Sequence, residues 1–158
     1  MVYPIFCTLI LACVCLPGLV TLTAAERSVT DIFRGNGKDA HLAFATAHAG
    51  EPFSGKETVI VVLTERNTGG EQHPEIMASF GKFGSALIVT FTRSGHLIGT
   101  EVAHTAHKKT PFSSLGELKV EGFHIEQGKV RGRLSTGGEV ESLGQTWEVN
   151  LSFRAKLT

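Results

Sequence analysis

The C-terminal stretch, residues 145–157, is the feature that most constrains the fold. Apolar and polar residues alternate there without a break, and the apolar set is Trp147, Val149, Leu151, Phe153, Ala155 and Leu157. A period of two over such a length indicates a β-strand with one buried face and one solvated face. In a helix the same residues would be spread around the whole circumference and leave no apolar side to bury. The fold is therefore expected to be built on a β-sheet.

Several earlier segments also read as strands. The β-branched run at residues 59–63 is typical of a strand buried on both faces, and we expect residues 57–65 to form the central strand. Residues 40–48 alternate in the same way, and residues 50–55 read as a loop. Val29, Ile32 and Phe33 predict a short edge strand or a loose arm.

Two hairpins are predicted in the second half of the chain. The first joins residues 85–93 to residues 96–105 through Ser94-Gly95. The second joins residues 117–126 to residues 129–136, and Gly128 is expected to be left-handed there while Gln127 is not, because positive φ is unfavourable for Gln. At Gly122 the alternation changes face, which predicts a β-bulge.

The expected fold class is mainly β, either an antiparallel β-sandwich or a small β-barrel with one short helix. The helix is predicted over residues 74–80, because Pro74 suits the first helical position, Glu75 the first turn and Gly81 the residue after the end. Seven or eight strands with turns between them are typical of both architectures, and the pattern leaves the two open. With no internal repeat, residues 26–158 are taken as a single β-rich domain.

Residues 1–25 are interpreted as a secretory signal peptide. This segment contains no charged side chain, residues 5–22 are nearly all apolar, and small residues lead to Ala25. It lacks the basic residue that usually begins a signal. A retained membrane anchor and a lipoprotein signal at Cys13 are the alternatives. Cleavage after Ala25 predicts an exported protein, periplasmic or extracellular, with no membrane insertion after cleavage.

Cysteine and charge narrow the chemistry further. All three cysteines, Cys7, Cys13 and Cys15, lie in the predicted signal, so the exported domain is expected to be disulfide-free and to rest on its hydrophobic core. Cysteine nucleophiles and thiolate metal sites are excluded with them. The 15 basic residues balance the 15 acidic ones, which gives no electrostatic reason to expect nucleic acid as a partner.

No catalytic motif stands out, and we predict that the protein is not an enzyme and carries no cofactor. Residues 50–57 match a P-loop except at the last position, where Glu57 replaces the Ser or Thr that would bind magnesium. A true P-loop also leads into a helix, whereas this one leads into a predicted strand. Neither a Gly-x-Ser-x-Gly elbow nor a His-Glu-x-x-His motif is present.

Seven histidines are the richest chemical signal, and His104 and His107 are the candidate metal ligands. Imidazole is the commonest metal ligand in proteins, but residues three apart on an extended strand point to opposite faces. The two rings can converge only if the chain bends near Thr105, and His96 or Glu101 would be the nearest third ligand. The favoured interpretation is that both are surface histidines near a strand end, without stoichiometric zinc or copper binding.

Residues 128–134 read G-x-V-x-G-x-L, and residues 147–155 read W-x-V-x-L-x-F-x-A. This pair of strands resembles the C-terminal half of uncharacterised exported bacterial β-rich domains, and residues 58–67 followed by a short helix are similar as well. The resemblance implies a secreted β domain and supplies no activity.

The function expected from the sequence is that of an exported non-catalytic β domain, a binding or envelope-structural module for an unknown protein or small ligand. A histidine-based metal-binding protein is the first alternative. A calycin-like barrel that encloses a small apolar ligand is the second. Clustered histidines would favour the former, and an apolar cavity the latter.

Overall fold

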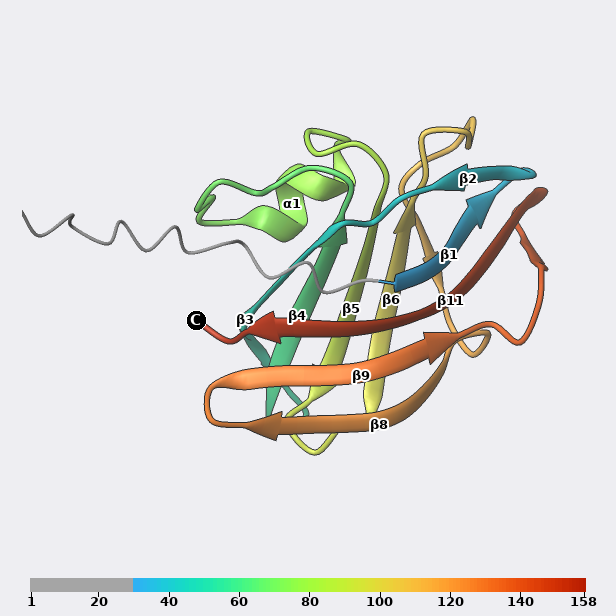
Figure 1. Ribbon diagram of the computed structural model, residues 1–158. Coiled ribbons are helices and arrows are strands. Elements are labelled where there is room, and N and C mark those ends of the chain that lie inside the picture. The colour runs from blue at the N-terminus through green and yellow to red at the C-terminus, as the bar shows by residue number, and fades with distance from the viewer. Residues whose placement is uncertain (1–29) are drawn as a thin grey trace, which may run out of the picture.

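The computed structural model describes residues 30–158, and these form a β-sandwich of two antiparallel sheets with one short helix (Figure 1). The mainly β prediction is confirmed. Because neither sheet closes on itself, the sandwich is correct and the barrel is not. The predicted signal peptide, residues 1–25, lies outside the described residues.

In the first sheet the strands lie side by side in the order β2-β1-β11-β9-β8, and the short strand β10 also pairs with β11. Its strands are β1 (Thr30–Gly35), β2 (Lys38–Ala40), β8 (Lys119–Glu126), β9 (Lys129–Ser135), β10 (Val140–Ser142) and β11 (Gln145–Lys156). The long C-terminal strand is thus interior, with β1 and β9 as its neighbours.

The second sheet has the order β3-β4-β5-β6-β7. Its strands are β3 (Phe44–Phe53), β4 (Lys56–Thr64), β5 (Ala86–Thr92), β6 (Leu97–Ala103) and β7 (Phe112–Ser114). The helix α1 (Pro74–Ser79) contacts β4, β5 and β6 and covers a small apolar cluster on the outer face of this sheet. Among the described residues, no helix is long and apolar enough to cross a membrane.

The main core lies between the two sheets and confirms the predicted alternation in β11. The side chains of Trp147, Val149, Leu151, Phe153 and Ala155 are buried there, while the intervening residues are half-buried or exposed. They meet the inward faces of β4 and β5. Those two strands are buried on both faces, because the first sheet covers their inward face and α1 covers their outward face. The prediction that residues 57–65 form a strand buried on both faces is confirmed, but in the strand order β5 is the middle strand and β4 lies beside it, so the prediction of β4 as the central strand was wrong.

Three further predictions need correction. The strand at residues 30–35 is paired on both sides, by β2 and β11, and is not an edge. Residues 50–53 belong to β3, so the expected loop shrinks to a turn at Ser54-Gly55. The described strands outnumber those predicted because β2, β7 and β10 have only three residues each, too few to show a period.

The second predicted hairpin is present, with a different turn. Gln127 has φ 50° and Gly128 has φ 69°, so both central residues are left-handed. Two such residues twist in the same sense as the flanking strands, and this gain outweighs the unfavourable φ of Gln127. The predicted bulge at Gly122 is confirmed by a register shift between Glu121 and His124.

Truncation of Trp147 tests the buried face of β11. Its side chain is fully buried, so Trp147→Ala should lower the free energy of unfolding by about 3–5 kcal/mol. Glu148 lies on the opposite face, where its carboxylate makes a 3.4 Å ion pair with Arg34, and Glu148→Ala should change stability by less than about 1 kcal/mol. Urea denaturation followed by circular dichroism measures both, and equal effects would contradict the register.

Candidate functional site

The connection between β6 and β7, residues 104–111, brings the two candidate histidines together. The chain turns directly after β6, and the His107 N–H donates to the His104 carbonyl at 2.9 Å. The ring centroids of His104 and His107 are consequently 5.2 Å apart. Both side chains are buried, with 1% and 6% of their surface exposed, and the interpretation as surface histidines was wrong. It failed because residues 104–111 pack back against the first sheet.

Backbone groups define the protonation of both rings. The Ala106 N–H donates to His104 Nδ1 at 3.1 Å, so the ring proton of neutral His104 is on Nε2. His107 Nε2 lies 2.9 Å from the Thr146 carbonyl, which only accepts, so this nitrogen carries the proton and donates. Among the described residues, the remaining nitrogens, His104 Nε2 and His107 Nδ1, are buried without a hydrogen bond of regular geometry, although the Lys38 backbone near the His104 ring raises the His104 pKa slightly.

Burial also determines the charge of His104. Desolvation lowers the pKa of His104 below its ordinary value, and the adjacent His107 lowers it further, against a smaller opposing effect of Glu65. The ring is therefore neutral at physiological pH. Because the folded-state pKa lies below that of the unfolded chain, the unfolded state binds the proton more readily. This histidine consequently favours unfolding as the pH falls below about 6.5.

A glycine of β1 makes the space for the two rings. A methyl group at Gly35 would lie 2.5 Å from His104 Cγ and 2.7 Å from His107 Nε2, both shorter than real contacts allow. Phe33 on the same strand packs against the His104 ring at 5.1 Å, and Phe112 of β7 packs against the His107 ring at 5.3 Å. The histidine pair is thus a packed part of the core at one end of the sandwich.

Side-chain amides fasten the same connection to the first sheet. Asn36 Nδ2 donates to the Ala106 carbonyl at 3.2 Å, and Asn36 Oδ1 accepts from the Thr146 N–H at 2.9 Å. The Gln145 side chain donates to the Lys109 carbonyl at 2.7 Å and accepts from the Lys109 N–H at 3.2 Å. Together with the His107 bond, these contacts hold residues 104–111 in one position against β11.

The arrangement is unlike a preformed metal centre. The two nitrogens nearest Gly35, His104 Nδ1 and His107 Nε2, are both engaged by backbone groups. Within residues 30–158, no group of three or more His, Cys, Asp or Glu residues is placed to hold a metal ion, so neither His96 nor Glu101 completes the pair. The two ring nitrogens that remain, His104 Nε2 and His107 Nδ1, offer at most two ligands, fewer than a stable metal site needs.

A cavity of about 210 Å³ lies beside this connection, on the outer side of the second sheet. Thr110 and Pro111 line one side of it, and Phe80 and Gly81, which follow α1, line the other. The Phe80 side chain is 81% exposed, an unusual state for an aromatic ring. Sequence reasoning treated Phe80 only as the last apolar residue of the helix. The sequence signal for the exposure of Phe80 was its spacing of four from Ile76, which places both residues on the same helical face. Ile76 is also exposed, at 47%.

A second cavity, of about 270 Å³, lies between β3 and the segment that leads into α1. On its margin His48 Nε2 and Glu75 Oε2 are 2.9 Å apart, while His48 Nδ1 lies 3.0 Å from the Ala49 carbonyl. This pair joins α1 to β3 at the margin of the cavity.

Comparison with known proteins supplies no family: no protein-family model, curated protein or solved structure matches the chain. The resemblance to exported bacterial β-rich domains therefore remains an expectation from the sequence.

Substitution of Gly35 tests the packing of the two rings. Gly35→Ala forces a methyl group into His104 and His107 and should destabilise the protein by about 1–3 kcal/mol, the cost of overpacking. Gly99→Ala is the matched control, because Gly99 also lies in a strand and a methyl group there meets no atom within 4 Å. Thermal melts of both variants measure the difference, and an unaffected Gly35→Ala would contradict the placement of residues 104–111.

Metal binding is tested directly by titration. We expect no stoichiometric binding of Zn²⁺ or Cu²⁺ at neutral pH by calorimetry, because within residues 30–158 no third His, Cys, Asp or Glu is placed to join His104 and His107. Tight one-to-one binding that disappears in a His104→Ala, His107→Ala double variant would contradict this and restore the metal-binding alternative.

Proposed function

We propose that the protein is an exported, non-catalytic binding domain that receives an apolar side chain of a protein partner in the cavity beside Phe80. The exposed Phe80 ring at the margin of a cavity is the observation that carries the proposal. Burying an exposed aromatic ring on a partner is strongly favourable, and aromatic residues are enriched among those that dominate binding energy.

The size of the cavity favours a single side chain over a complete small molecule. Pockets for drug-sized ligands measure roughly 300–1,000 Å³. The cavity beside Phe80 has about 210 Å³ and is bounded by Ala103, Pro111 and the ring itself. One aliphatic or aromatic side chain of a partner suits this volume.

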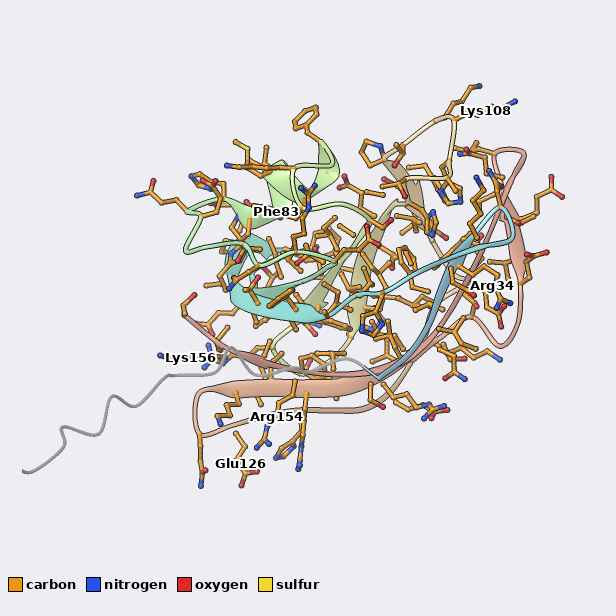
Figure 2. The ribbon with its side chains drawn as sticks, turned by 45° about the horizontal axis from the view of Figure 1, so that its top comes forward. Arg34, Phe83, Lys108, Glu126, Arg154 and Lys156 are labelled. Carbon is orange, nitrogen blue, oxygen red and sulfur yellow. The ribbon has the colours of Figure 1, made fainter. Side chains whose placement is uncertain are left out.

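Positive charge beside the cavity indicates which residues should flank the partner's apolar side chain. Lys108 and Lys109 are exposed on residues 104–111, next to the Thr110-Pro111 wall of the cavity, and neither forms an ion pair within the described residues. Lys108 projects from the tip of this connection in Figure 2. Two unpaired ammonium groups favour a partner with acidic residues beside the apolar one, mainly by accelerating association.

The contacts that fasten residues 104–111 support a binding role. A cavity wall held by His107, Asn36 and Gln145 is already in place before a partner arrives, which reduces the entropic cost of association. The metal-binding alternative is less favoured, because the histidine pair has no third ligand within the described residues. Export rests on the predicted signal at residues 1–25 and the absence of cysteine from residues 26–158.

Peptide titration tests the proposal. In ¹⁵N–¹H spectra, acetyl-Glu-Phe-Glu-amide should shift resonances of residues 79–84 and 103–111, while acetyl-Lys-Phe-Lys-amide should bind at least about threefold more weakly because it meets Lys108 and Lys109. Phe80→Ser should abolish the shifts caused by the first peptide.

The matched control is Phe53→Ser, because Phe53 is also exposed, at 54%, and lies at the β3–β4 turn. This variant should bind the acidic peptide like the unmodified protein. Shifts that persist in Phe80→Ser, or that are lost equally in Phe53→Ser, would contradict a site at Phe80.

A further inference from the structure

The strand β8 forms one border of the first sheet, with β9 on its inner side and no strand of the described chain on its outer side (Figure 1). Three of its apolar residues, Val120, Phe123 and Ile125, pack against the core and remain only partly buried. A further strand along this border would complete their burial and satisfy the outward N–H and C=O groups.

The charges along β8 are complementary to those of a second copy of β8 that runs antiparallel to it. In an antiparallel pair of two copies with the symmetry axis between Gly122 and Phe123, Lys119 of one copy stands opposite Glu126 of the other. Glu121 then stands opposite His124. Each pair occurs twice by symmetry, because residue i meets j and j meets i. The apolar Val120 stands opposite Ile125.

The bulge at Gly122 makes this pairing geometrically consistent. Residues directly opposite in a ladder project from the same face of a sheet. In a regular strand Val120 and Ile125, five residues apart, would point to opposite faces. Here Gly122, with φ 60°, shifts the register, and both side chains pack toward the core. The charged members of β8 accordingly share the other face.

The ion pairs that Glu126 makes within one copy can be exchanged for a pair with a second copy. Its Oε2 lies 3.6 Å from His124 Nε2 and 4.0 Å from the Arg131 guanidinium, and the Glu126 side chain is 60% exposed. Exposed pairs at such distances contribute little and rearrange easily. Figure 2 shows Glu126 at the border of the molecule, beside the β8–β9 turn.

We propose that β8 is a self-association surface through which two copies of this chain form a dimer with a sheet continuous across the two-fold axis. Bulges and charges commonly protect a sheet border from unwanted pairing. In β8 the order of charges, basic at Lys119 and acidic at Glu126, is instead attractive in the antiparallel arrangement of two identical strands. The partner that this surface fits is therefore a second copy.

Charge exchange along β8 tests the proposal by sedimentation equilibrium of the full chain. Lys119→Glu places a carboxylate opposite Glu126 of the other copy, and Glu126→Lys places an ammonium group opposite Lys119. Each variant should dimerise at least about tenfold more weakly than the unmodified chain, because the change acts twice. The double variant Lys119→Glu, Glu126→Lys restores both pairs and should dimerise like the unmodified chain.

Mixing supplies a second measurement. The Lys119→Glu and Glu126→Lys variants, each of which dimerises weakly alone, should form a mixed dimer more readily, since both pairs across the axis then join one carboxylate to one ammonium group. Lys56→Glu changes the net charge equally outside β8 and should leave dimerisation unchanged. Circular dichroism must show that all variants fold.

Two results would overturn the proposal. One is an unmodified chain that remains monomeric at millimolar concentration, which would mean that the β8 charges protect the border. The other is a double variant as weak as the single variants, which would exclude the proposed register.

Discussion

Burial of one face of β11 is the constraint on which the rest of the structure depends. Trp147 and the apolar residues that follow it at alternate positions fill the space between the sheets, and β1, β9 and β10 all pair with this strand. Because its backbone pairs with strands on both sides, β11 positions most of the first sheet. Its first residues, Gln145 and Thr146, also hold the connection that bears the histidines.

The histidine pair shows how buried polar groups can specify a conformation. Burying a polar group without a partner is costly, and the backbone supplies one partner to each ring, the Ala106 N–H to His104 and the Thr146 carbonyl to His107. Those partners are available in one placement of residues 104–111, with Gly35 leaving room for the rings. The two histidines that suggested a metal site thus hold residues 104–111 in place as one wall of the cavity beside Phe80.

The two proposed surfaces lie at different ends of the sandwich and do not compete. Lys108 and Glu126 are far apart in Figure 2, on opposite borders of the molecule. Association through β8 would therefore leave the cavity beside Phe80 open in both copies. A dimer would present two such cavities, and a partner with two binding segments would gain from their joint effective concentration.

The sequence by itself determined the elements whose side chains repeat over many residues. The period of two in β11, the β-branched run in β4, the hairpin at residues 127–128 and the helix beginning at Pro74 all follow from local patterns. Three-residue strands were missed because they contain no full repeat. Only the tertiary structure decided that the sheets remain open, that His104 and His107 are buried, and that Phe80 is exposed. Each of these three features depends on which distant segments of the chain pack together. A local sequence pattern contains no information about such packing.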